Sequence, residues 1–112
     1  MAAEDRTHMR AEVTHPRVEV DGPALEGFCR RHHIRRLSLF GSVLREDFGP
    51  DSDIDVLVEF EPGHTPGLAF MRMERELSGL FGGRQVDLVT PRFLNHRIRD
   101  RILAEAQTQY AA

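Results

Sequence analysis

Residues 53–60, Asp-Ile-Asp-Val-Leu-Val-Glu-Phe, alternate between polar and apolar side chains. A period of two with many β-branched residues predicts a strand that has one apolar face and one polar face. The side chains expected to point into a core are Ile54, Val56, Val58 and Phe60. Asp53 and Asp55 would share the opposite face, where two carboxylates repel each other unless a cation lies between them. Such a pair is hard to explain by packing, and hard oxygen ligands at the end of a strand suit Mg²⁺.

The patterns around this strand predict a small α/β (α+β) domain, with helices packed on a mixed sheet of three to four strands. Its expected elements are a helix over 23–33, a strand over 36–40, a short helical turn after Gly41-Ser42, a helix capped by Thr65-Pro66, a strand over 85–90 and a last helix after Thr90-Pro91. The last helix should place Leu94, Ile98, Ile102 and Ala106 on one face. Residues 21–112 are expected to form this domain, and residues 1–20 a flexible or loosely packed arm.

Composition excludes several classes of function. All 15 basic residues are arginine, so no lysine nucleophile, P-loop lysine or lysine base is available. A net charge of −3 argues against direct nucleic-acid binding, although it leaves nucleotide binding open. With a single cysteine, Cys29, the chain cannot form an intramolecular disulfide, and Cys29 is expected in the core. No segment has the length of a membrane span, so we expect a soluble, cytoplasmic protein.

Further residues extend the acidic pair into a candidate site. Asp87 lies in an apolar strand pattern, where a carboxylate without a partner is costly. If that strand lies beside residues 53–60, the three carboxylates converge, and three acids can hold two Mg²⁺ ions for phosphoryl or nucleotidyl displacement. Gly41 and Ser42 end a strand before a helical turn, which favours an anion site of backbone N–H groups and a hydroxyl. Arg45, one turn later, could hold a terminal phosphate.

The spacing of these residues resembles a known pattern. Gly41-Ser42, ten intervening residues, and then Asp53 and Asp55 resemble the motif of the minimal nucleotidyltransferases in the DNA polymerase β-like superfamily. The resemblance covers roughly residues 23–106. It implies that Gly41 and Ser42 contact the triphosphate of ATP and that Asp53, Asp55 and Asp87 bind Mg²⁺. Asp87 would also help to deprotonate the attacking hydroxyl, whereas the residue at Arg45 is basic but variable in the family.

Many members of this group are antitoxins encoded beside a HEPN-domain protein. The resemblance therefore implies transfer of AMP from ATP to a tyrosine of a HEPN toxin, and a hetero-oligomer with that toxin. One alternative is an antitoxin that neutralises its toxin by stoichiometric binding without catalysis. Another is a nucleotidyltransferase that acts on a small molecule such as an aminoglycoside, although the chain has no room for a second domain to hold it.

Structural interpretations of the same residues stay open. Asp87 could be the ion-pair partner of a nearby arginine, and Arg45 a solvated surface charge. His32 and His33 are adjacent, and adjacent helical residues do not face the same way, so surface or capping roles are expected for them rather than a metal site.

Overall fold

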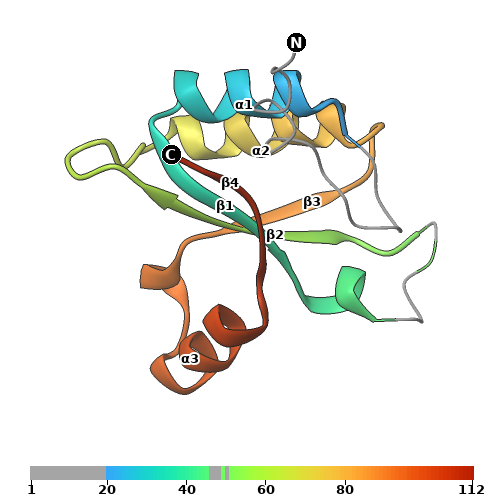
Figure 1. The fold of residues 1–112 in the computed structure, drawn as a ribbon, viewed down its shortest axis with the longest axis vertical. Helices are drawn as coiled ribbons and strands as arrows, with labels where there is room; N and C mark the ends of the chain where they lie inside the picture. Colours follow the sequence, from blue (N-terminus) through green and yellow to red (C-terminus); the bar gives the residue numbers. More distant parts are fainter. Residues whose placement is uncertain (1–19, 46–48, 50) are drawn as a thin grey trace, which may run out of the picture.

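A four-stranded mixed sheet organises the part of the chain that this computed structural model describes, residues 20–45, 49 and 51–112 (Figure 1). Its strands are β1 (Ile34–Phe40), β2 (Ile54–Phe60), β3 (Val86–Val89) and β4 (Gln107–Ala111). They lie in the order β3-β2-β1-β4. β1 is antiparallel to both β2 and β4, whereas β2 and β3 are parallel. The predicted α+β class is confirmed, and the arm predicted for residues 1–20 lies almost entirely outside the described residues.

Helices lie on both sides of this sheet (Figure 1). The α-helices are α1 (Gly22–Arg31), α2 (Ala69–Leu80) and α3 (His96–Glu105), and two 3₁₀ turns are η3 (Gly41–Leu44) and η4 (Pro91–Phe93). α1 and α2 lie together over one face of the sheet, and α3 lies on the other side. Because parallel strands cannot be joined by a tight hairpin, α2 provides the crossover from β2 to β3.

The main core lies between the sheet and the α1–α2 layer. Ile54, Val56 and Val58 are fully buried in it, as the alternation of β2 predicts, and Phe60 is half-buried against it. Leu57 points to the opposite face of the sheet and is also buried, at 1% exposure. On this second face, the buried Leu57 therefore separates Asp55 from Glu59 near the far end of the strand.

Both predicted helix starts at Thr-Pro pairs are wrong. α2 begins at Ala69, after Leu68, and residues 65–66 belong to the preceding loop. Pro91 opens only the three-residue turn η4, because Leu94 then returns to an extended conformation. α3 begins at His96, where the Asn95 side chain accepts a hydrogen bond from the Arg97 N–H at 2.9 Å. Asparagine at this position satisfies one of the N–H groups that a helix start leaves unpaired.

The last strand, β4, was not predicted. Helix α3 ends at Glu105, and Ala106 after it has an extended backbone. Residues 107–111 then pair with β1 as an edge strand. The sequence Gln-Thr-Gln-Tyr-Ala has little apolar alternation, so its strand conformation depends on hydrogen bonds to β1 rather than on its own pattern. Ser38 and Thr108 face each other across this pair, with their hydroxyl oxygens 3.4 Å apart.

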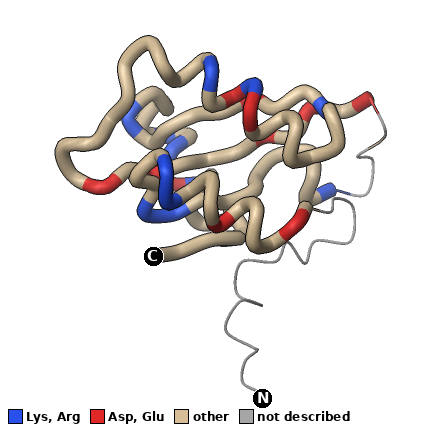
Figure 2. The backbone as a smooth tube through the Cα atoms, turned by 90° about the horizontal axis from the view of Figure 1, so that it is seen from above, with Lys and Arg blue, Asp and Glu red and all other residues tan. Residues whose placement is uncertain are grey.

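Surface and core otherwise follow the composition. Acidic and basic residues are interspersed along the described backbone (Figure 2). Cys29 is buried, as expected, and burial raises the pKa of its thiol to about 12. Within residues 20–45, 49 and 51–112, none of the helices combines the length and apolar character that a membrane crossing requires.

Candidate active site

Two of the predicted acidic residues lie side by side where β1 ends and β2 and β3 begin. Asp55 is the second residue of β2 and Asp87 the second residue of β3, and the parallel register places them opposite each other. Residues paired in this way point to the same face of a sheet. Asp53 directly precedes β2 and is exposed. The two acidic strands therefore lie side by side, which is the condition under which the three carboxylates were expected to converge.

The pKa of Asp55 depends on the other predicted site residues around it. Burial, followed by the charges of Asp87 and Asp53, raises the pKa of Asp55 above its usual 3.8. A hydrogen bond from the Ser42 backbone N–H and the positive charge of Arg45 act in the opposite direction. Nearby carboxylates and incomplete hydration both disfavour the ionised form, whereas an N–H donor and a cation favour it. Asp55 and four of the other five predicted site residues are thus close enough to influence its ionisation.

The sixth, Gly41, makes the closest approach to Asp55. Gly41 has φ +74°, a left-handed conformation that glycine adopts without the steric cost of a side chain. A Cβ atom added there would lie 2.3 Å from Oδ2 of Asp55, so any other residue would force the carboxylate to move. The preceding residue, Phe40, is paired with Asp55 across β1 and β2. Glycine therefore allows the chain to turn directly against the carboxylate.

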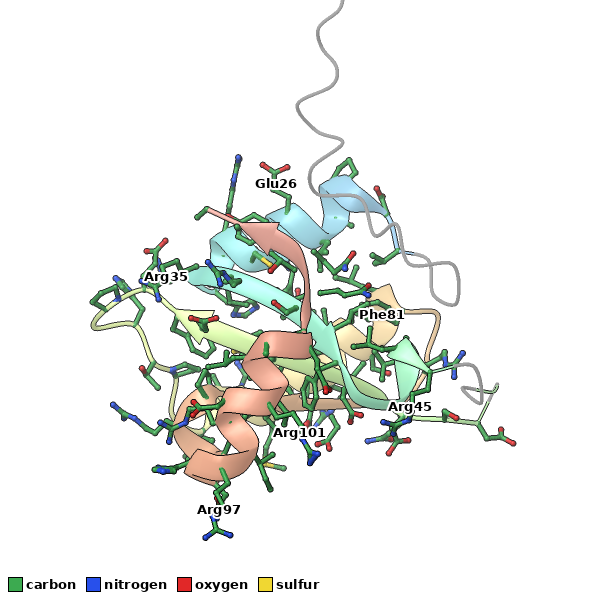
Figure 3. The ribbon with its side chains drawn as sticks, turned by 60° about the horizontal axis from the view of Figure 1, so that its bottom comes forward. Glu26, Arg35, Arg45, Phe81, Arg97 and Arg101 are labelled. Atoms are coloured by element: carbon green, nitrogen blue, oxygen red, sulfur yellow. The ribbon has the colours of Figure 1, made fainter. Side chains whose placement is uncertain are left out.

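The short turn η3 connects the glycine to both acidic positions. The Ser42 hydroxyl donates to the backbone carbonyl of Asp53 at 3.3 Å, while the Ser42 backbone N–H reaches the Asp55 carboxylate. Arg45 follows η3, its backbone N–H donating to the Ser42 carbonyl at 2.9 Å. Figure 3 shows the Arg45 side chain at this end of the sheet. The Gly-Ser turn and the acidic pair are consequently one connected unit.

Sequence inspection missed Arg84, which positions the loop before Asp53. Its Nη2 donates to the carbonyls of Gly49 and Ser52 at 2.6 and 2.9 Å, and the Ser52 hydroxyl accepts a hydrogen bond from the Gly49 N–H at 3.0 Å. Arg84 is half-buried and lies two residues before the first residue of β3, Val86. The Gly82-Gly83 pair before it indicates only a turn, so the sequence gives no sign of a contact across more than thirty residues.

Glu74 of α2 was also missed. Its carboxylate accepts a hydrogen bond from the backbone N–H of Leu88, at 2.9 Å. Leu88 follows Asp87 on β3, which is an edge strand. The contact satisfies an edge N–H that would otherwise be available to another strand, and it ties α2 to the strand that carries the third acid.

The donor set fits Mg²⁺. Asp53, Asp55 and Asp87 supply oxygen atoms only, the ligands that this ion prefers, and each lies near the sheet end where Gly41 leaves room for the carboxylate. The carboxylate oxygens of these three aspartates do not all lie within 4.8 Å of one another. Among the described residues, only His33, Glu61 and His64 bring three ligand atoms within 4.8 Å of one another. Mutual repulsion is expected to keep like charges apart.

Two pockets lie near the strands that carry the acids. One, of about 220 Å³, is lined at the far end of β2 and β3 by residues that include Glu59, Thr65 and Arg92. The other, of about 260 Å³, lies between α2 and the start of β3. The three aspartates line neither pocket. Asp53 and Asp87 are exposed and Asp55 is half-buried, so an acceptor carried by another protein could reach the first two carboxylates.

Known proteins are similar to this chain in sequence and in fold. Residues 24–108 match the family model described as a nucleotidyltransferase domain. A Thermococcus cleftensis protein named protein adenylyltransferase MntA is 40% identical over 76 residues, which are 67% of this chain and 74% of the relative. A solved structure described as a minimal nucleotidyltransferase is 44% identical, with a TM-score of 0.63 over 75% of this chain and 84% of the other.

A second solved structure shares the fold at lower sequence identity. It is a toxin–antitoxin crystal structure with AMP-PNP, 18% identical, with a TM-score of 0.65 over 80% of this chain and 73% of the other. At this identity the likeness concerns the fold alone. The 44% identical minimal nucleotidyltransferase is the structure that confirms the predicted nucleotidyltransferase fold.

Proposed function

Because the chain belongs to the nucleotidyltransferase domain family, we propose that it transfers AMP from ATP to a tyrosine hydroxyl of a HEPN-domain toxin, and so acts as an antitoxin. The observation that carries this proposal is the pairing of Asp55 with Asp87 beside Gly41. The Thermococcus relative bears the name of a protein adenylyltransferase, and a structure with the same fold is a toxin–antitoxin complex with an ATP analogue, which supports both the reaction and the partner.

Each predicted residue has a role in this reaction. The backbone N–H groups of Gly41 and Ser42 would hold triphosphate oxygens, and Arg45 would contact the terminal phosphate. Asp53, Asp55 and Asp87 would bind two Mg²⁺ ions, which when bound would neutralise phosphate charge in the transition state. Arg84 would act indirectly, by fixing the loop that carries Asp53.

The chemistry is an in-line displacement at the α-phosphorus. The tyrosine oxygen forms the new bond to phosphorus, the bond from the α-phosphorus to the bridging oxygen breaks, and pyrophosphate leaves. Asp87 would accept the hydroxyl proton, because it is the most accessible strand carboxylate of the site. An exposed base suits an acceptor that arrives on another protein.

Stoichiometric binding without catalysis is the second candidate. Large apolar side chains are exposed on the described surface, with Leu68 at 97% and Phe93 at 73% exposure. A protein partner would bury such side chains, whereas a small-molecule acceptor would not. The same residues therefore favour a protein partner over an aminoglycoside-like substrate.

The test uses the full chain with a purified HEPN-domain toxin as the acceptor. ATP labelled at the α-phosphate is supplied with Mg²⁺, and the HEPN protein is digested and analysed by mass spectrometry. We expect an added AMP on tyrosine, with loss of the label for Asp55→Asn and for Asp87→Asn. Asp100→Asn, on exposed α3, is the matched control and should label its partner normally.

Toxin neutralisation in cells separates the two candidates. If Asp53→Ala/Asp55→Ala still neutralises the toxin and the wild type adds no AMP, the catalytic proposal is wrong and binding is the mechanism. If an aminoglycoside is modified in the absence of a protein partner, the proposed acceptor is wrong.

A further inference from the structure

Three potential metal ligands meet at the end of the sheet opposite the aspartates. His33 directly precedes β1 and Glu61 directly follows β2, with His64 three residues later in the same loop. One ligand atom from each of these residues lies within 4.8 Å of the other two. Ile34 pairs with Phe60 at this end, whereas Phe40 pairs with Asp55 at the other. Strands of this length separate the two ends by roughly 20 Å.

Backbone hydrogen bonds hold the three residues together. The Glu61 N–H donates to the His33 carbonyl at 2.9 Å, and the His64 N–H donates to the Glu61 carbonyl at 3.0 Å. His33 has φ +56°, a conformation that is uncommon outside glycine, asparagine and aspartate. The α1–β1 turn and the loop after β2 are thus fixed against each other before any side chain contributes.

The side chains converge on the solvent side of this junction. Nδ1 of His33 lies 3.7 Å from Oε1 of Glu61, and the His33 and His64 rings stack with their centroids 3.9 Å apart and their planes inclined by 19°. All three are partly or fully exposed, so a rotation about their side-chain bonds can bring the ring nitrogens around one ion.

The ligand chemistry selects the kind of metal. Two imidazole nitrogens and one carboxylate oxygen are a common ligand set for Zn²⁺, whose fourth position is then taken by water. Mg²⁺ and Ca²⁺ prefer oxygen ligands throughout, so this cluster and the aspartate site should select different ions. The neighbouring His32 does not belong to the cluster, because its Nε2 lies 3.0 Å from Glu76 of α2.

We propose that His33, Glu61 and His64 form a Zn²⁺ site that is separate from the nucleotide site. The bound ion would join the α1–β1 turn to the loop that leads from β2 to α2. Its effect is structural, because it would stabilise the strand pair that carries Gly41 and Asp55 at the other end. This inference is independent of the acceptor proposed above.

The test measures zinc binding by the full chain after removal of any histidine tag. Mg²⁺ is kept in excess so that the aspartates are occupied by their preferred ion. Calorimetry with ZnSO₄ should give saturable binding. The midpoint of thermal unfolding, Tm, should rise by roughly 10 °C when the zinc concentration is a hundredfold above its Kd. His64→Gln and His33→Asn should each weaken binding at least tenfold. Asparagine suits the left-handed backbone at position 33, so the second variant should fold.

His32→Gln is the matched control, since it removes the adjacent histidine without touching the cluster. It should bind zinc as the wild type does. Imidazole NMR signals of the wild-type chain provide a measurement that needs no variant, and those of His33 and His64 should shift with zinc while that of His32 stays. The proposal is overturned if His64→Gln binds zinc as tightly as the wild type, or if zinc leaves the His33 and His64 signals unchanged. The three residues would then form an ion pair and no metal site.

Discussion

Replacing Gly41 by alanine tests the packing of the Gly-Ser turn against the site most directly. The added Cβ would lie 2.3 Å from Oδ2 of Asp55 and 3.1 Å from its Cγ. An ordinary contact of 3.4 Å or more requires the carboxylate to move by about 1 Å. Asp55 is held by the pairing of β2 with β1 and β3 on either side, so its side chain must move rather than its backbone.

Two separate effects on free energy and rate follow from this geometry. A non-glycine residue at φ +74° costs about 1–2 kcal/mol of folding free energy, which lowers Tm by roughly 5–10 °C in a domain of this size. A shift of about 1 Å in a catalytic group can reduce the rate about 100-fold. Gly41→Ala should therefore fold with moderate loss of stability and lose most of its transfer activity.

Gly82→Ala is a matched control for the backbone effect. Gly82 also has φ +74°, but a Cβ there would meet no atom within 4 Å. Its variant should show the same loss of Tm with full activity. The assay is the transfer of labelled AMP, measured well below the Tm of both variants. If Gly41→Ala retains activity within a few-fold of Gly82→Ala, then the contact with Asp55 does not control the reaction.

Three further predictions concern single residues. Because burial and neighbouring carboxylates raise the pKa of Asp55, its ionised form destabilises the fold at neutral pH. Asp55→Asn should thus abolish transfer and raise Tm at neutral pH. The gain in Tm should disappear below pH 3.8, where the wild-type aspartate is protonated in both the folded and the unfolded chain. An unchanged Tm at neutral pH would contradict this. Arg84→Ala should slow transfer about tenfold by releasing the loop before Asp53, with Arg75→Ala on α2 as an inert control. Cys29 should react with a thiol reagent only after unfolding, because its pKa is about 12; rapid modification of the native chain would refute the buried position.

The sequence allowed the central part of the fold and site to be predicted because local pattern and chemistry agree there. Alternation identified β2, and the cost of burying an acid drew attention to Asp87. Their pairing was only assumed as a condition for the acids to converge, and the structure explains it through α2, because a strand–helix–strand unit favours parallel neighbours. The positions of Gly41 and Asp55 against each other then depend only on where β1 ends.

Contacts between distant segments could not be predicted in this way. β4 has no apolar alternation and is held by β1, and Arg84 reaches carbonyls that its own neighbours do not indicate. The histidines illustrate the same limit. His33 was interpreted as a helical surface residue, but α1 ends at Arg31, and the left-handed turn at His33 directs it toward Glu61 while His32 contacts Glu76. Because α1 ends two residues earlier than predicted, His32 and His33 leave the helix in different directions and contact different carboxylates.

The absence of lysine takes on a physical meaning only at particular positions. Two of the arginines lie close to the candidate site, Arg84 against the loop before Asp53 and Arg45 near Asp55. Burial can lower the pKa of a lysine, whereas a guanidinium keeps its charge and offers five N–H donors in a fixed planar arrangement. Arg84 uses this property to hold two carbonyls from a single nitrogen. Arg84 therefore holds the loop before Asp53, while Arg45 partly offsets the negative charge around Asp55, and neither arginine becomes a competing base in the site.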